Sequence, residues 1–371
     1  MKRLPIIRPV FDETETDNLR RCLESGHVTQ GPFVAEFEQR FAERHNAAHA
    51  VAVTSCTAAL HLALLALGIG RGDEVIVPSL TFVATANAVE LTGARPVFAD
   101  VEARTFTVDV ALLESAITSK TRAVIPVHLF GLCADMDPLR EIAAKHKLRV
   151  IEDAACAAGS AYRGRSAGVL GHAACFSFHP RKAITTGEGG MITTNNAELA
   201  AKLRILRNHG AQPMPAGAPP WAMPAYRECG CNFRMSDLQA AVGCAQMRKM
   251  DAILKERARI AGMYSERLRD MPDVITPFAP DDCGHSWQSY VVRLEGGKPR
   301  RDEISERLRL AGVETRCGTH AAHRLEYYAR KYGLSPDCCP AAALCEDSSL
   351  ALPVAHGMKD EDIDRVAACF V

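Results

Sequence analysis

The chain alternates short apolar runs with stretches of helical spacing. Five runs are apolar on both faces, and the first four are each followed by apolar residues three and four positions apart. Buried strands that alternate with helices in this way predict an α/β fold with a mostly parallel, doubly wound sheet. The strands are expected at 48–54, 74–78, 96–101, 122–130 and 148–153. The helices are expected at 57–67, 81–93, 108–117 and 137–147.

The second half of the chain follows a different pattern. Strands at 173–178 and 191–194 have no full helix between them, and the Pro- and Gly-rich stretch 209–229 is expected to be a loop. One long helix is predicted over 236–269, where Ser236 and Gln239 have the spacing of a capping box. Further elements are expected at 287–294, 301–312, 313–316 and 360–370. These patterns predict a large domain over 1–250, which includes an N-terminal helical segment, and a smaller one over 251–371.

Composition narrows the possible partners. The 371 residues are 47% apolar and 24% charged, with 44 basic and 44 acidic side chains. A net charge of zero supplies no field for a phosphate backbone, so no nucleic acid partner is expected. The apolar stretch 58–67 is too short to span a bilayer, and Pro5, Arg8 and Pro9 interrupt the N-terminal one. No membrane partner is expected, and the protein is expected to lie in the cytoplasm.

The fourteen cysteines do not form a recognisable framework. They are scattered through a long chain that has its own core, and none forms a CxxC pair. The nearest groupings are Cys229 with Cys231 and the adjacent Cys338 and Cys339, neither of which has zinc-finger spacing. Reduced thiols and no metal are therefore expected.

Residues 55–58 lie between the end of a strand and the start of a helix. Free backbone N–H groups and the positive end of the helix make such a place suitable for an anion. An ordinary helix cap at Ser55 explains the same residues equally simply.

Asp153 closes the predicted strand 148–153, at the edge where open α/β sheets bind ligands. A carboxylate there can hold a proton on a buried heteroaromatic nitrogen. Alternatively, Glu152 and Asp153 cap the next turn.

The stretch 175–192 places Lys182 just beyond a strand end, ahead of a glycine-rich turn. A lysine at the mouth of a site can lose its proton and attack carbonyl groups, although most lysines are solvated surface charges. The turn matches neither a Walker A loop nor GxGxxG, so no dinucleotide is indicated.

An anion cup, a carboxylate for a ring nitrogen and a carbonyl-reactive lysine together are what pyridoxal phosphate requires. Phe82, just past another strand, is a candidate to stack on the pyridine ring, although core packing explains a phenylalanine there as well.

With these residues in view, the sequence resembles the DegT/StrS family of PLP-dependent nucleotide-sugar aminotransferases, which have the type I aspartate aminotransferase fold. The resemblance extends over nearly the whole chain, and 176–190 is its most specific part. The matching stretches are 25–41, 72–89, 126–139, 151–160, 176–190, 206–210, 232–243 and 350–366.

The resemblance implies a role for each matched position. Lys182 corresponds to the lysine that forms a Schiff base with the cofactor, and Asp153 to the acid on its pyridine nitrogen. The other implied cofactor contacts are Phe82 on the ring, Thr57, Ala58 and Ser177 at the phosphate, and Cys156 near the ring. Asn232 corresponds to a residue that reaches the phosphate of the neighbouring subunit, which implies a homodimer. His179, Arg234 and His323 are candidates for substrate binding.

Three positions depart from the family pattern. Cys156 replaces a glutamine or histidine, and a thiol is a weaker hydrogen-bonding group than either. Cys56 stands where glycine is usual, and the stretch 317–328 lacks the proline that ordinarily precedes its histidine.

The resemblance implies transfer of an amino group from L-glutamate to a keto group of a nucleotide-linked deoxyhexose, at C4 rather than C3. A related sugar dehydratase is an alternative, but such enzymes typically carry histidine in place of Lys182. A non-catalytic binding module is a further alternative, and it is not favoured because no stretch of the chain remains for an effector domain.

Overall fold

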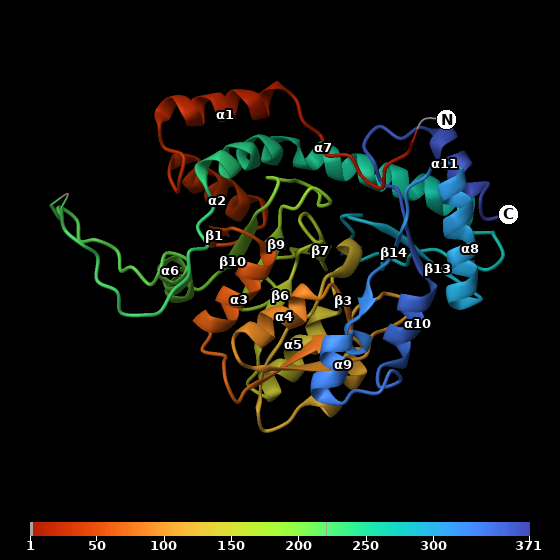
Figure 1. The fold of residues 1–371 in the computed structure, drawn as a ribbon, viewed down its shortest axis with the longest axis horizontal. Coiled ribbons are helices and arrows are strands. Elements are labelled where there is room, and N and C mark those ends of the chain that lie inside the picture. The colour runs from red at the N-terminus through yellow and green to blue at the C-terminus, as the bar shows by residue number, and fades with distance from the viewer. Residues whose placement is uncertain (1–2, 220) are drawn as a thin grey trace.

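The computed structural model describes residues 3–219 and 221–371, and a seven-stranded sheet forms its centre (Figure 1). The strand order is β1-β10-β9-β6-β5-β2-β4. All neighbours from β9 to β4 are parallel, whereas β10 is antiparallel to both β1 and β9. The strands are β1 (His49–Val53), β2 (Glu74–Pro78), β4 (Arg95–Ala99), β5 (Thr121–Val124), β6 (Arg149–Asp153), β9 (Ala173–Ser177) and β10 (Gly190–Thr194). The predicted doubly wound fold is confirmed.

Helices cover both faces of this sheet. In β1, Ala50 and Ala52 face one apolar core, while Val51 and Val53 face the other. The first core includes residues of α2, α5 and α7, and the second includes residues of α3, α4 and α6. The helices are α1 (Glu13–Ser25), α2 (Pro32–Arg44), α3 (Cys56–Ala66), α4 (Ala84–Leu91), α5 (Met136–Lys145), α6 (Ala197–Leu206) and α7 (Asp237–Leu268). Strands buried on both sides explain the unbroken apolar runs of the sequence.

The C-terminal part builds a second, antiparallel sheet in the order β11-β13-β16-β14. Its elements are β11 (Val274–Ile275), β13 (Tyr290–Leu294), α8 (Gly297–Leu310), β14 (Arg316–Cys317), α9 (Glu326–Tyr332), α10 (Pro340–Ser348), β16 (Ser349–Leu352) and α11 (Asp360–Ala367). Leu4 packs in the core beneath this sheet, although it lies at the other end of the chain. The boundary proposed at residue 250 falls inside α7, which runs along both parts of the molecule (Figure 1).

Some elements differ from the sequence prediction. The strand expected over 122–130 ends at Val124, because Pro126 has no N–H to continue the ladder. The helix expected over 108–117 is a 3₁₀ helix, Val110–Ala116. The helix expected from 81 begins at Ala84, after the two-residue strand β3 (Leu80–Thr81), which pairs with β15 (His320–Ala321).

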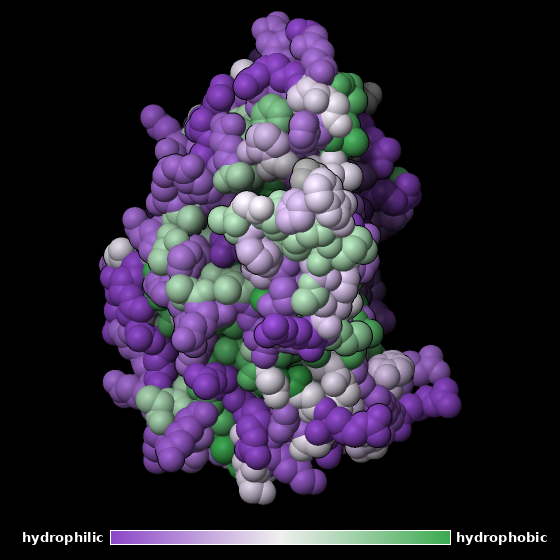
Figure 2. Space-filling view, turned by 90° about the vertical axis from the view of Figure 1, so that its left-hand side faces the viewer, coloured by the Kyte–Doolittle hydropathy of each residue, from purple (hydrophilic) through white to green (hydrophobic). Residues whose placement is uncertain are grey.

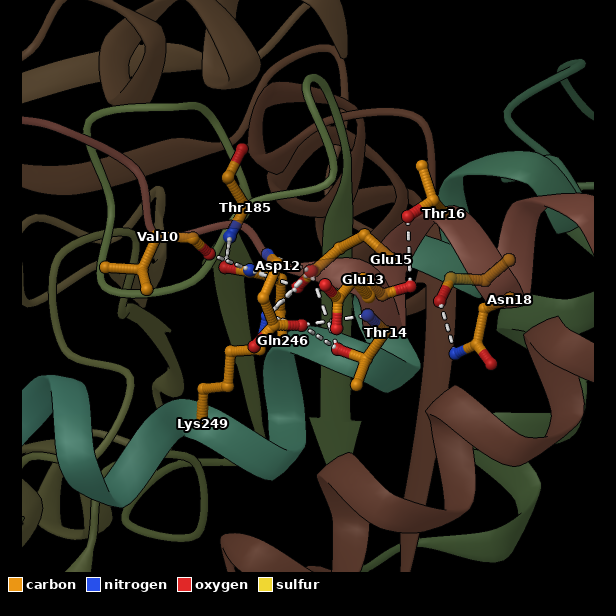
Figure 3. A network of polar contacts seen from close by, with 11 residues as sticks. Val10, Asp12, Glu13, Thr14, Glu15, Thr16, Asn18, Thr185, Gln246 and Lys249 are labelled. Carbon is orange, nitrogen blue, oxygen red and sulfur yellow. Dashed lines mark hydrogen bonds and ion pairs between the residues drawn. The ribbon is translucent and has the colours of Figure 1, made fainter.

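A buried polar network joins α1, α7 and the segment after Lys182 (Figure 3). Gln246 on α7 donates to the Val10 carbonyl and to Glu15, and its own oxygen lies 3.3 Å from the Thr185 N–H. The Lys249 ammonium contacts both Asp12 and Glu15, and it holds the pKa of Asp12 far below its usual value. These contacts with α1 and α7 therefore hold the segment that follows Lys182 in place.

Throughout residues 3–219 and 221–371, no helix combines the length and apolarity that a membrane crossing requires.

Candidate active site

A cavity of about 410 Å³ opens between the two sheets, at the carboxyl ends of the parallel strands. Most of the residues that the sequence singles out line it. They are Thr57, Phe82, Asp153, Cys156, Ser177, His179 and Lys182. The small sheet contributes the opposite wall through β14, the following residues and β16.

Lys182 lies in the loop between β9 and β10, and its ammonium donates to the Cys156 sulfur at 3.2 Å. Its backbone is fixed on both sides. The Lys182 N–H donates to the His179 carbonyl, and its carbonyl accepts from the buried Arg257 of α7 at 2.9 Å. Burial lowers the pKa of Arg257 to about 10, so this clamp stays charged at neutral pH. These two hydrogen bonds thus hold the backbone of Lys182 in place at the wall of the cavity.

Asp153 is the last residue of β6 and is 5% exposed. One carboxylate oxygen accepts from Thr85 Oγ1 at 2.7 Å, and the other accepts from the Ala155 N–H at 3.1 Å. Burial raises the pKa of this carboxyl, and the two hydrogen bonds oppose that shift. Asp153 therefore does cap the turn that follows β6. This cap uses one carboxylate oxygen, and the carboxylate still lines the cavity.

Glu152, the neighbour of Asp153, points away and is fully buried. It accepts from three backbone N–H groups, those of Gly168, Leu170 and Gly171, and contacts His128 at 3.0 Å. Glu152 is therefore structural, which separates the roles of the two adjacent acids.

The N-terminus of α3 supplies an anion cup. Ser55 caps the helix by accepting from the Ala58 N–H, and Thr57 lines the cavity while Ala58 is buried beneath. Gly190 lies so close that a Cβ there would approach the Ser55 carbonyl to 2.4 Å. Glycine is thus required at position 190, where β10 lies in close contact with the start of α3.

Phe82 is 58% exposed although it lines the cavity, so it is not a core residue. His179 is half-buried, and burial together with the Arg181 charge lowers its pKa. Cys56 is buried, its thiol donates to the Cys175 carbonyl, and burial raises its pKa well above the usual range.

Three predicted residues do not join this group. Asn232 is exposed and bridges to Asn208, and Arg234 donates to Asn208 at 2.5 Å; neither lines the cavity of its own chain. His323 is fully buried, with its ring nitrogens against Ser79 and the Pro336 carbonyl. His323 is therefore not accessible to a ligand in the cavity.

Sequence reasoning missed Thr85, Arg181 and Arg316. Arg181 belongs to the stretch 176–190 and could have been noted beside Lys182. Arg316 lies in no recognised motif, and only the folding of β14 over the cavity reveals it. Neither guanidinium makes a hydrogen bond or ion pair with the residues that the structure describes, and both are exposed on the cavity wall.

These residues fit pyridoxal phosphate. The cavity has a lysine for an aldehyde, a buried carboxylate for a ring nitrogen, an exposed aromatic ring and a helix N-terminus with a hydroxyl beside it. On this fold, such a site defines a PLP-dependent transferase.

The chain belongs to the DegT/DnrJ/EryC1/StrS aminotransferase family, whose model matches residues 9–371. It is a PLP-dependent aminotransferase. The expected family, cofactor and enzyme class are confirmed.

Relatives and solved structures agree with this assignment. The chain is 43% identical to GDP-perosamine synthase from Caulobacter vibrioides, over 99% of this chain and 97% of that protein. It is 41% identical to the spore coat polysaccharide biosynthesis protein SpsC from Bacillus subtilis, over 98% and 95%. S. venezuelae DesV, solved with a ketimine intermediate, superposes with a TM-score of 0.91 at 36% identity, covering 100% of this chain and 98% of that one. Streptococcus pneumoniae Spr1654 has been solved in PLP and PMP forms, and its PMP form gives a TM-score of 0.94 at 29% identity, covering 99% and 98%.

Proposed function

We propose that this enzyme transfers an amino group from L-glutamate to the C4 keto group of a GDP-linked deoxyhexose. The observation that carries the proposal is that Lys182 and the buried Asp153 share one cavity, which is also open to exposed arginines. The match to GDP-perosamine synthase along almost its whole length supports the nucleotide and the sugar class. The proposed location is the cytoplasm.

The chain's own residues divide the work. Bound pyridoxal phosphate supplies an electron sink for a carbanion. Lys182 Nζ would move the proton at the reacting carbon, because it lies in the cavity and, as a neutral amine, has a lone pair that can accept the proton and then return it. Asp153 holds a proton on the ring nitrogen, and Thr85 keeps its carboxylate in place. The N-terminus of α3 binds the phosphate at Thr57, with Ser177 close by.

The acceptor's diphosphate requires positive charge that the whole molecule does not supply. Arg324, which follows His323 in the sequence, already contacts Glu346 and Asp347. Arg181 and Arg316 have no such partners among the described residues and line the cavity. Guanidinium groups bind phosphate oxygens through paired hydrogen bonds, so we assign the diphosphate to these two arginines.

A homodimer is part of the proposal. Asn232 and Arg234 lie outside the cavity of their own chain. Just before them in the sequence, residues 209–219 and 221–229 belong to an arm that extends away from the body (Figure 1). Trp221 and Met223 on this arm are more than 80% exposed, at 82% and 81%. On the face from which the arm projects, pale and green residues gather over the centre and polar ones surround them (Figure 2). A second copy of the chain covers this face in the proposed assembly.

The two half-reactions test the function. Glutamate alone should bleach the yellow band of the purified enzyme, and a GDP-linked 4-keto-6-deoxyhexose should restore it and yield an amino sugar. Borohydride should trap the cofactor on Lys182. Lys182→Ala should be inactive, whereas the matched control Lys120→Ala should retain full activity. If a small keto acid other than 2-oxoglutarate restores the band and every nucleotide-linked keto sugar fails, the substrate assignment is wrong.

Changing the arginines tests the diphosphate assignment separately. Arg181→Gln and Arg316→Gln should each raise the KM for the nucleotide sugar by roughly ten- to a hundredfold, because each loses a charge-assisted contact of roughly 1.5–3 kcal/mol. The glutamate half-reaction should be unchanged, and Arg309→Gln on exposed α8 is the control. A slower glutamate half-reaction with unaltered sugar KM would instead place the donor carboxylate at these arginines.

A further inference from the structure

His323 forms a cluster with two adjacent cysteines, and none of the three residues lines the cavity. The ligand atoms of His323, Cys338 and Cys339 all lie within 4.8 Å of one another, and the two sulfurs are 4.0 Å apart. Zinc ligands at their usual distances are roughly 3.3–3.8 Å apart. The cluster is therefore within about 1 Å of the spacing that one tetrahedral ion requires.

The hydrogen bonds of His323 leave one ring nitrogen able to bind a metal. Nε2 lies 2.8 Å from the Pro336 carbonyl, which can only accept, so Nε2 carries the proton. Nδ1 therefore has a free electron pair, which accepts from Ser79 Oγ at 2.5 Å. A histidine that donates one N–H to a backbone carbonyl is the usual arrangement of a metal ligand. The Ser79 hydroxyl can turn to the Cys339 sulfur, with which it also interacts.

The two cysteines differ in their exposure. Cys339 is buried, and zinc would bind it as the thiolate with release of its proton. Cys338 is exposed, which leaves a side of the cluster open to solvent. The nearby Asp100 is occupied by the Ala341 and Ala342 N–H groups of α10.

We propose that His323, Cys338 and Cys339 bind one zinc ion per chain, with water as the fourth ligand. The ion joins the η3 turn (Ala322–Arg324) to the start of α10, and so closes the segment that contains α9. Sequence spacing did not reveal this site, because its cysteines are adjacent and its histidine precedes them by a whole helix.

Metal uptake by the holoenzyme tests the proposal. After treatment with a chelator, equilibrium dialysis should return one zinc ion per chain, and Co²⁺ should give the d–d bands of a tetrahedral site with thiolate ligands. Cys338→Ser should lower the zinc affinity at least about tenfold, because even the loss of a residue that merely orients a ligand lowers metal affinity by that factor. Because Cys338 is exposed, this variant should fold normally. Cys229→Ser, at another exposed cysteine, is the matched control and should bind like wild type.

Thermal melting provides a second readout. Zinc should raise the Tm of the wild type and of Cys229→Ser, because a ligand that binds only the folded state stabilises it. It should raise the Tm of Cys338→Ser much less. Wild-type enzyme that takes up no zinc, or uptake that is equal in Cys338→Ser, would overturn the proposal.

Discussion

Asp153 combines two opposing requirements in one side chain. The proposed function requires its charge beside the ring nitrogen, yet it is buried at the end of β6, where Thr85 and the Ala155 N–H are its hydrogen-bond partners. Burial raises its pKa, so at higher pH the protein retains a costly charge. The site is therefore less stable than an uncharged one of the same shape would be.

Asp153→Asn should consequently separate stability from activity. A raised folded-state pKa means that cofactor-free wild type loses stability as the pH rises through that pKa. The asparagine variant should not show this loss, so its Tm should exceed that of wild type at neutral pH, and the difference should vanish in acid. Its kcat should fall by about a hundredfold or more. Calorimetry across pH tests this, and a lower Tm at neutral pH would contradict it.

Thr85 is a positioning residue for the same carboxylate. Its hydroxyl lowers the pKa of Asp153 against the larger effect of burial. Thr85→Val should therefore move the acid limb of the kcat profile to higher pH, whereas Thr85→Ser should restore the wild-type profile. A uniform loss of kcat at every pH, with no shift of the limb, would indicate a purely structural role.

At the scale of single residues, part of the candidate site could be predicted from the sequence. Asp153 ends β6 and Lys182 follows the end of β9, and a local pattern is enough to place such residues at the sheet edge. Thr85 and Arg316 reach the same cavity through packing between distant segments, for which the sequence has no local signal. His323 shows the reverse case, because a motif match placed it in a site from which its burial excludes it.

At the scale of helices and strands, Asp237 links two helices, since it is the first residue of α7 and its side chain caps α2. Its carboxylate accepts from the N–H groups of Gly31, Phe33 and Val34 and so caps α2, a helix remote in sequence. The capping box predicted at Ser236 and Gln239 is confirmed beside it. Two helix N-termini are thus fixed together by adjacent residues.

Asp237→Ala should destabilise the protein by about 2–3 kcal/mol, because it leaves buried N–H groups without an acceptor. Asp251→Ala on the same helix is the control. Asp251 makes an exposed ion pair with Arg44, and its loss should cost less than about 1 kcal/mol. Denaturant unfolding measures both changes, and equal effects would refute the capping role.

The helices and strands of the large sheet were largely predictable, because both-face burial gives strong apolar runs. The boundaries of the 81–93 helix and the 122–130 strand were not, since β3 pairs with a distant strand and Pro126 interrupts a ladder. The short strand expected at 313–316 lies instead at Arg316–Cys317, where it pairs with β16.

For the molecule as a whole, the proposed dimer makes a distinct prediction. If Asn232 completes the partner's site, mixing inactive Lys182→Ala and Asn232→Asp subunits should restore activity. One site of each heterodimer then carries both defects and the other carries neither. The activity should approach about a quarter of the wild-type value after full exchange, in line with half of the molecules having one intact site. Verified subunit exchange without recovery would show that each site is built from one chain.

The pairing of Leu4 with Val313 has a consequence for the synthesis of the chain. The Leu4 N–H donates to the Gly312 carbonyl, and the Leu4 carbonyl accepts from the Glu314 N–H. Ile6 and Ile7, just beyond, line the cavity. The ribosome adds Leu4, Ile6 and Ile7 long before it adds residues 312–314, so this early segment stays without its partners until the later one has emerged. The wall of the cavity therefore joins segments that are synthesised far apart in time, and it is complete only after the later segment has been made.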